Sequence, residues 1–204
     1  MPLFILERDS TVTKNKTHLI VVSAPSGAGK TTLCRKLLLE FPGLTLSISS
    51  TTRAPRGSEK HGTEYFFLTK DEFEKQIQQS GFAEWAQVHG NYYGTSKAVI
   101  ERAFQAGQSV LLDIDVQGAE QLKKSFPEIC HRIFISPPTL EELETRLRKR
   151  GTDSEESIQK RLKNARQEMV ASQTFDHIVV NDSFDRAYSE LKSILEKHYQ
   201  LKGL

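Results

Sequence analysis

The chain has few of the residues that would place it in a specialised class of protein. It has only two cysteines among its 204 residues, Cys34 and Cys130, and both stand in apolar patterns. Buried thiols therefore fit the sequence better than a disulfide bond does. No apolar run approaches the ~20 residues that a membrane-spanning helix needs. The net charge of +2 is too small to predict a nucleic-acid or membrane surface.

The first 17 residues also lack a signal. Their short apolar run, Leu3 to Leu6, has no basic region ahead of it, so a signal peptide is not expected. We interpret residues 1–17 as an N-terminal extension. The length of 204 residues predicts one globular domain, and the composition, 37% hydrophobic and 26% charged, is ordinary for such a domain. Such a chain suits a cytoplasmic enzyme or binding domain and is compatible with a homo-oligomer.

Strand and helix patterns alternate along most of the chain. Apolar strand-like runs occur at 18–24, 44–50, 109–115, 131–136 and 177–182. Amphipathic helical patterns lie between or after them, at 31–41, 97–106, 139–150, 154–172 and 183–198. This alternation predicts an α/β fold with a parallel sheet covered by helices on both faces.

One region breaks the alternation and is predicted to be an insertion of mixed β structure, residues 51–95. It contains a strand-like run at 64–69, a helical pattern at 71–80 and a hairpin that turns at His89-Gly90-Asn91. The core of the domain is then predicted to comprise residues 18–50 and 96–204.

The segment APSGAGKT, residues 24–31, matches the P-loop pattern, with alanine in the first glycine position. An apolar strand precedes it and an amphipathic helix follows it, as a nucleoside triphosphate site requires. Glycines let successive backbone N–H groups turn toward a phosphate, and the helix N-terminus adds partial positive charge. We expect Lys30 to reach the β- and γ-phosphates and the Thr31 hydroxyl to bind Mg²⁺. The residues predicted to hold the nucleotide are Ala24, Pro25, Ser26, Gly27, Ala28, Gly29, Lys30, Thr31 and Thr32.

A second apolar run ends in two carboxylates, Asp113 and Asp115. If both lie on one extended strand, their side chains point to the same face. One or both could then hold a metal ion through water, as the Walker-B aspartate does. Alternatively, one of them simply caps the helix that follows.

The stretch RAPRGSEKHGTEYFF, residues 53–67, places two arginines three positions apart on a polar loop. Arg53 and Arg56 are suited to bind a carboxylate or phosphate. A solvated basic loop is the alternative, so the assignment depends on a second anion being present. A P-loop accounts only for the donor nucleotide.

Four segments together resemble the successive signatures of the guanylate kinase family. They are SSTTRAPRGSEKHGTEYFF, FAEWAQVHGNYYGTS, LLDIDVQG and RGTDSEESIQKRL, and they occur in the family's order with compatible spacing. The resemblance extends from about residue 18 to the C-terminus. It implies a P-loop kinase whose inserted region binds GMP.

The resemblance implies a role for each polar residue of the insertion. Arg53, Arg56, Tyr65 and Tyr93 resemble the clamp on the GMP phosphate. Glu84 is expected to recognise guanine, because a carboxylate can accept both the N1–H and the N2 amine. The positions that support the base in the family correspond here to Ser49, Thr95 and Asp115.

The segment 146–162 resembles the family's lid, with Gly151 as a joint between two helical patterns. It carries the arginines expected to close on the transferred phosphoryl group, which are Arg146, Arg150 and Arg161. Asn181 and Asp182 resemble positions near the ATP adenine. Lys30 and the lid arginines are the predicted catalytic groups, while Thr31 and Asp113 are the predicted metal ligands.

The expected reaction is ATP + GMP ⇌ ADP + GDP, by direct in-line transfer with Mg²⁺, and dGMP is a second expected acceptor. Two alternatives remain. One is a binding module with the same fold that holds a phosphorylated peptide, although such a module has no need of Lys30 and a hydroxyl at position 31. The other is a related P-loop kinase that acts on a different phosphorylated acceptor.

Overall fold

A computed structural model describes residues 16–88, 90–151 and 153–203 of the chain. Its centre is a five-stranded parallel sheet with the strand order β2-β7-β1-β8-β9. The strands are β1 (Leu19–Ser23), β2 (Leu44–Leu46), β7 (Ser109–Asp113), β8 (Cys130–Ser136) and β9 (His177–Val180). The predicted α/β fold class is confirmed.

Helices cover both faces of this sheet, which explains why its central strands are apolar without alternation. Ile20 and Val22 of β1 pack against α1 (Lys30–Glu40) and α7 (Phe184–Tyr199). Leu19 and Val21 face the opposite way. There they meet α3 (Lys97–Gln105) and α4 (Val116–Ser125). The sheet thus directs the carboxyl ends of β1 and β7 to one edge, where the loops that follow them can form a site.

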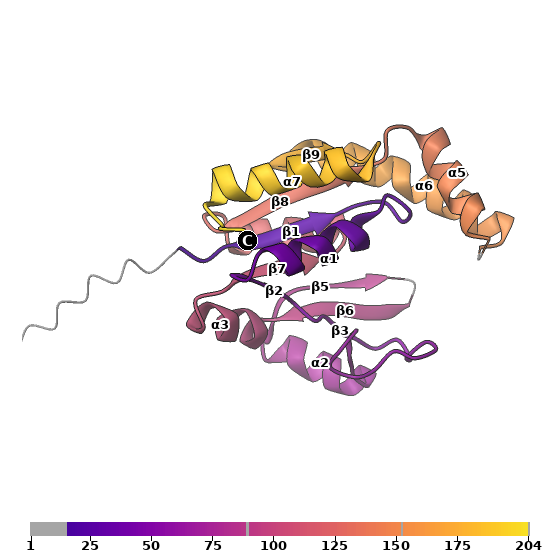
Figure 1. Cartoon of the computed structure of the whole chain (residues 1–204). Coiled ribbons are helices and arrows are strands. Elements are labelled where there is room, and N and C mark those ends of the chain that lie inside the picture. The colour runs from indigo at the N-terminus through magenta and orange to yellow at the C-terminus, as the bar shows by residue number, and fades with distance from the viewer. Residues whose placement is uncertain (1–15, 89, 152, 204) are drawn as a thin grey trace, which may run out of the picture.

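A second, mixed sheet of four strands lies below the main sheet in Figure 1, in the order β4-β3-β6-β5. Its strands are β3 (Ser50–Thr51), β4 (Phe66–Phe67), β5 (Phe82–Val88) and β6 (Asn91–Ser96). Helix α2 (Lys70–Gln78) begins at a capping box formed by Thr69 and Glu72. The fully buried Phe73 of α2 stacks on Phe82 of β5, with ring centroids 4.3 Å apart.

Two antiparallel helices project from the main sheet on the right of Figure 1, α5 (Leu140–Arg150) and α6 (Glu155–Ala171). They have a small apolar core of their own, in which Leu143 and Leu147 meet Ile158 and Leu162. Gly151 ends α5 in the left-handed conformation at φ 65°. A short 3₁₀ helix, η1 (Ser172–Thr174), leads from α6 to β9.

The structure corrects several expected boundaries. The run 44–50 is not one strand, because β2 lies in the main sheet and β3 in the second sheet. The expected strand 64–69 is only two residues long, β4. The second sheet runs from Ser50 to Ser96, one residue beyond the predicted 51–95 at each end. Within the described ranges, no helix is long and apolar enough to cross a membrane.

The expectation that Asp113 and Asp115 share one extended strand is wrong. Strand β7 ends at Asp113, and Asp115 is the N-cap of α4. The Asp115 carboxylate accepts a hydrogen bond of 2.8 Å from the backbone N–H of Gly118. The alternative, that one of the two caps the next helix, is therefore confirmed for Asp115.

Candidate active site

The P-loop connects β1 to α1, and a hydrogen bond from the Asn181 side chain to its backbone holds it in place. Gly27 and Gly29 have φ values of 97° and 93°, so both stand in the left-handed region that glycine favours. The buried Asn181 side chain donates to the Ala28 carbonyl oxygen at 2.7 Å. A Cβ atom on Gly29 would overlap the same amide group. The loop therefore leaves the N-terminus of α1 open to an anion.

A cavity of about 970 Å³ opens in front of this loop. It is lined by most of the predicted nucleotide-binding and lid residues. They are Ala24, Pro25, Ser26, Gly27, Gly29, Lys30, Thr31, Thr32, Asp113, Arg146 and Arg150. Ala28, by contrast, is fully buried and contributes only its backbone.

Lys30 and Asp113 lie at the centre of the cavity and form an ion pair through Nζ and Oδ1. The exposed Thr31 hydroxyl follows in the first turn of α1. A hydroxyl and a carboxylate are oxygen ligands that suit Mg²⁺, which commonly takes one or two protein ligands besides substrate phosphates. No cluster of three or more His, Cys, Asp or Glu residues that could hold a metal occurs among the described residues. The arrangement therefore fits a metal that arrives with a nucleotide.

A second cavity of about 260 Å³ continues from the first toward the four-stranded sheet. The two cavities share five lining residues, which are Ala24, Lys30, Ser49, Tyr65 and Asp113. The second cavity is also lined by Glu84, Tyr93 and Asp115. Lys30 and Asp113 thus stand where two bound molecules would meet.

Glu84 reaches this second cavity because the ladder between β5 and β6 is irregular. The register shifts between Phe82 and Glu84, and both residues and the Ala83 between them are buried. A bulge of this kind re-aims a side chain that regular alternation would turn away. The Glu84 Oε1 atom accepts a hydrogen bond of 2.7 Å from the buried Thr95 hydroxyl.

Burial raises the pKa of Glu84 to about 7, while the hydrogen bond from Thr95 lowers it and the charge of Asp115 raises it further. A buried carboxylate with one oxygen still free for a partner is costly to ionise. Two N–H donors from a ligand would stabilise its charged form. The site is therefore chemically suited to a base edge with adjacent donors.

The predicted phosphate clamp is assembled around Arg53. Its guanidinium lies 5.4 Å from the Tyr65 ring centroid and makes an ion pair of 2.9 Å with Glu59. The hydrogen bond with Glu59 raises the pKa of Arg53, and a hydrogen bond with Tyr93 adds to this. The Tyr65 and Tyr93 rings are 6.1 Å apart. Three of the four predicted clamp residues thus lie together.

Arg56 differs from the other clamp residues because its side chain is exposed. Its backbone N–H donates to Glu59 Oε2 at 2.8 Å. One carboxylate therefore bridges both arginine positions of the loop. Glu59 is a residue that the sequence did not single out, and no periodicity marks it.

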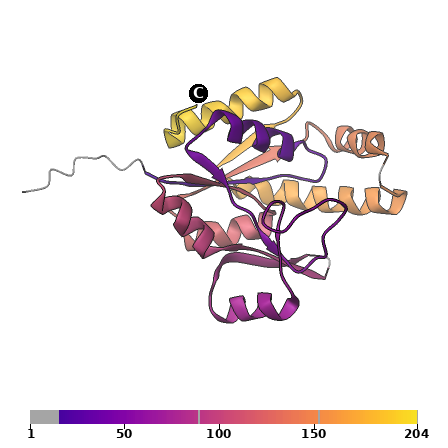
Figure 2. The same ribbon diagram turned by 60° about the horizontal axis from the view of Figure 1, so that its bottom comes forward.

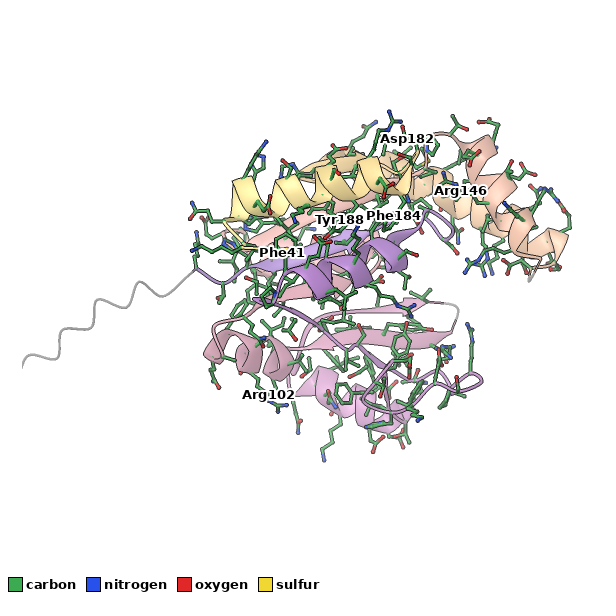
Figure 3. The ribbon with its side chains drawn as sticks, in the orientation of Figure 1. Phe41, Arg102, Arg146, Asp182, Phe184 and Tyr188 are labelled. Atoms are coloured by element: carbon green, nitrogen blue, oxygen red, sulfur yellow. The ribbon has the colours of Figure 1, made fainter. Side chains whose placement is uncertain are left out.

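The lid arginines stand at different distances from the P-loop. The Arg161 guanidinium contacts the Ser26 hydroxyl and also pairs with Asp153 at 3.0 Å. Arg146 also lines the first cavity and pairs with Glu142, one turn earlier on α5, at 3.1 Å. Figure 3 shows Arg146 on the projecting helix. Arg150 lines the first cavity, and no described residue is its ion-pair or hydrogen-bond partner.

The structure gives Asn181 and Asp182 local partners. The Asn181 amide is committed to the P-loop backbone, and Asp182 forms an ion pair with Arg186 on α7. Figure 3 shows Asp182 near the beginning of α7. Neither residue lines either cavity, so their predicted place beside the adenine stays a prediction.

Glu168 on α6 was missed by the sequence analysis although it lines the first cavity. Its Oε2 atom is buried without a hydrogen-bond partner among the described residues. Burial raises the pKa of Glu168 to about 7, and the charge of Lys30 opposes this. A glutamate in a charged amphipathic helix gives no sequence signal of such a position.

Comparisons with known proteins agree with this geometry. The sequence model of the guanylate kinase family matches residues 16–198. A guanylate kinase of Prochlorococcus marinus is 50% identical over 89% of this chain and 98% of its own length. One from Geobacter sulfurreducens is 50% identical over 89% of each chain.

The fold matches as well. A crystal structure of guanylate kinase from Anaplasma phagocytophilum superimposes with a TM-score of 0.74 at 31% identity. The superposition covers 93% of this chain and 91% of that one. The residues matched by the family's sequence model, 16–198, include the P-loop, the inserted sheet and the projecting helices. The chain therefore belongs to the guanylate kinase family.

Proposed function

We propose that the protein transfers the γ-phosphoryl group of ATP to the phosphate of GMP, giving ADP and GDP. The observation that carries this proposal is the pair of contiguous cavities that share Lys30 and Asp113. One cavity has a P-loop and the other has the buried carboxylate Glu84. Two nucleotides bound there would place their phosphates at the shared residues.

On the donor side, the P-loop backbone and the N-terminus of α1 bind the ATP phosphates. Lys30 leaves Asp113 and follows the charge that migrates from donor to acceptor. Phosphoryl transfer has a loose transition state, so positioning and charge neutralisation carry the catalysis. No covalent nucleophile is required. Thr31 and Asp113 would hold Mg²⁺, which would supply neutralisation of part of the phosphate charge.

On the acceptor side, Arg53 and Arg56 bind the GMP phosphate with help from the Tyr65 and Tyr93 hydroxyls. Glu84 accepts from the guanine N1–H and N2 amine. The residues assigned here contact the base and the phosphate, so dGMP is expected to be a second acceptor. Adenine has neither of the two donors, so AMP would leave a buried carboxylate without partners.

The lid, residues 146–162, completes the site by closing over the phosphates. Arg161 already contacts the P-loop at Ser26, while Arg146 and Arg150 of α5 line the first cavity. Closure would bring these arginines to the transferred group and exclude water, which suppresses wasteful hydrolysis of ATP. We place this reaction in the cytoplasm.

The test is an assay of ADP release with ATP, Mg²⁺ and each of GMP, AMP, CMP and UMP. Turnover with GMP and not with the other three is the expected result. Binding of nucleotides without any turnover would support the binding module instead. Turnover with a different acceptor would move the assignment to another P-loop kinase.

The role of Glu84 is tested by Glu84→Gln. Glutamine offers one acceptor and one unwanted donor, so kcat/KM for GMP should fall by roughly 100-fold or more. The KM for ATP should stay within about twofold, because the P-loop is untouched. An equal loss for both nucleotides would contradict base recognition by Glu84.

A further inference from the structure

Gly118 lies directly beside the carboxylate assigned to guanine. It stands in the first turn of α4 and is buried. A Cβ atom at this position would lie 2.6 Å from Glu84 Oε2 and 3.1 Å from Glu84 Cδ. Ile114 Cδ1 follows at 3.2 Å. The close neighbour of Gly118 is therefore the carboxylate itself.

The backbone of α4 gives no reason for a glycine at this place. Gly118 is not among the residues with positive φ, and its N–H is bound to the Asp115 carboxylate within an ordinary N-cap. Glycine destabilises helices relative to alanine, so it is a poor choice for a helical position. An alanine at position 118 would instead remove the space that the Glu84 carboxylate occupies.

A second residue of α4 fixes the strand that carries Glu84. The Gln121 side chain accepts from the Trp85 N–H at 3.2 Å and donates to the Trp85 carbonyl oxygen at 2.9 Å. Strand β5 is at the edge of its sheet, and Gln121 satisfies both backbone groups there as a neighbouring strand would. The residue adjacent to Glu84 is thereby tied to the core helix.

We propose that α4 is the element that sets guanine specificity, with Gly118 providing the space for the Glu84 carboxylate and Gln121 fixing its backbone. Gly118 is then a specificity-determining residue that touches no substrate. This inference rests on the role proposed for Glu84. It explains why one helix of the parallel-sheet core is packed against the inserted sheet at this particular strand.

The geometry predicts which oxygen is affected. Thr95 holds Oε1, whereas Oε2 is the atom that faces Gly118. A methyl group at position 118 is fixed to the helix backbone, so the carboxylate has to move. Because Oε1 is anchored, movement would rotate Oε2 out of the plane in which guanine presents its two donors.

The first experiment is Gly118→Ala with GMP and ATP titrated separately. We expect the KM for GMP to rise about tenfold or more, as for a lost or displaced polar partner, and the KM for ATP to stay within about twofold. IMP lacks the N2 amine of GMP. The ratio of kcat/KM for GMP to kcat/KM for IMP should therefore decrease. The thermal midpoint should be unchanged or higher, since alanine favours the helix.

The matched control is Gly43→Ala. A Cβ atom on Gly43 meets nothing within 4 Å, and its φ is not in the left-handed region. This variant should leave both KM values unchanged. If Gly118→Ala lowered the thermal midpoint and weakened both nucleotides equally, Gly118 would have only a packing role and the inference would be wrong.

A double-mutant cycle with Glu84→Asp separates the steric contact between position 118 and the Glu84 carboxylate from the other effects of Gly118→Ala. Aspartate withdraws the carboxylate by one methylene group, which makes room for the new methyl. The penalty of Gly118→Ala on GMP should therefore shrink to less than about threefold in the Glu84→Asp background, as expected for contacting residues. Equal penalties in both backgrounds would contradict a steric link.

Gln121→Ala tests the other half of the inference. It should raise the KM for GMP and leave that for ATP unchanged, because only the β5 backbone is released. If Glu84→Gln has its selective effect on GMP but Gly118→Ala and Gln121→Ala have none, this inference fails alone. If Glu84→Gln shows no selectivity, the proposed role of Glu84 fails first.

Discussion

The two halves of the site are built in different ways. The donor half is a continuous segment, residues 24–32, whose backbone faces the cavity at the end of a fully buried strand. The acceptor half takes single side chains from β5, from β6, from the loop between β3 and β4, and from the positions just before β3 and α4. Figure 2 shows that loop in dark purple beside the strands of the second sheet. A backbone site is set by local conformation, whereas a side-chain site depends on each residue separately.

The difference extends to how each half is supported. The P-loop is held by the core of the protein, through a buried amide on Asn181 and the first turn of α1. The acceptor half is held by polar contacts between its own side chains, such as Thr95 to Glu84 and Glu59 to Arg53, and by the hydrogen bonds of Gln121 of α4 to the β5 backbone. Substitutions on the donor side should therefore impair chemistry broadly, and those on the acceptor side should act on GMP alone.

The largest expected effect is on the donor side, at Lys30, one of the five residues that line both cavities. Lys30→Ala should lower kcat by roughly 1,000-fold or more, because it removes a charge that stabilises the transition state. GMP binding measured by calorimetry should be nearly unchanged. Lys36→Ala, on the same helix but above the Tyr188 ring, is the control and should be close to wild type. A small effect of Lys30→Ala on kcat would contradict its catalytic role.

The next effect tests the acceptor clamp. Arg53→Ala should raise the KM for GMP by about 10- to 100-fold, as for a lost charge-assisted hydrogen bond, and leave the KM for ATP unchanged. Arg102→Ala is its control, since Arg102 is exposed on α3 (Figure 3) and lines neither cavity. Unchanged GMP kinetics in Arg53→Ala would contradict the phosphate clamp and favour the alternative of a solvated basic loop.

A smaller effect is expected from pH. Glu84 must be ionised to accept both guanine donors, and its pKa in the folded protein is about 7 instead of about 4.5. GMP affinity should therefore fall as the pH drops from 8 to 6, by up to about tenfold per unit below the pKa. Calorimetric titrations of the wild type over this range measure the fall.

Two variants identify the group responsible for this pH effect. Glu84→Gln should leave only the weaker dependence caused by the phosphate, whose second pKa is about 6. Glu168→Gln should keep the effect, although Glu168 titrates in the same range. The same shift has a consequence for folding. The native state retains this proton above the usual carboxyl pKa, so the Glu84 contribution to the free energy of unfolding decreases as pH rises from 4.5 to 7.

The smallest effect concerns the support of the P-loop. Asn181→Ala removes a buried hydrogen bond to Ala28 and should cost about 1–3 kcal/mol of stability. The KM for ATP should rise a few-fold while that for GMP stays constant, measured in the same coupled assay. A rise in the KM for GMP alone would show that Asn181 supports the acceptor half. That result would contradict the separate support of the two halves.

The sequence predicted the main sheet, the P-loop and the hairpin of the second sheet, because each has a local pattern. It failed where local signals conflict with tertiary packing. The run 44–50 alternates like one strand, yet Ser47 to Ser49 form the crossing between two sheets. The spacing of Asp113 and Asp115 is equal to that of strand neighbours, but the N-cap preference of aspartate determines where β7 ends.

Other parts of the site could not be found from sequence at all. Glu59, Gln121 and Glu168 gain their positions only when distant segments pack together, and glutamate and glutamine are common on surfaces. The same is true of Gly118, because the side chain that requires a glycine there, Glu84, is 34 positions away in the chain. The bulge in β5 that turns Glu84 inward leaves no pattern of its own.

The pairing of Glu59 with Arg53 means that the acceptor clamp already carries a negative charge of its own. An incoming group does not fill a bare positive site but has to displace a carboxylate held at 2.9 Å. We expect this to act as a threshold. A phosphate dianion offers more charge and more oxygens than Glu59 does and can win the exchange, whereas chloride or a monoanionic carboxylate cannot. We therefore expect the loop to bind dianions in preference to monoanions before phosphoryl transfer begins.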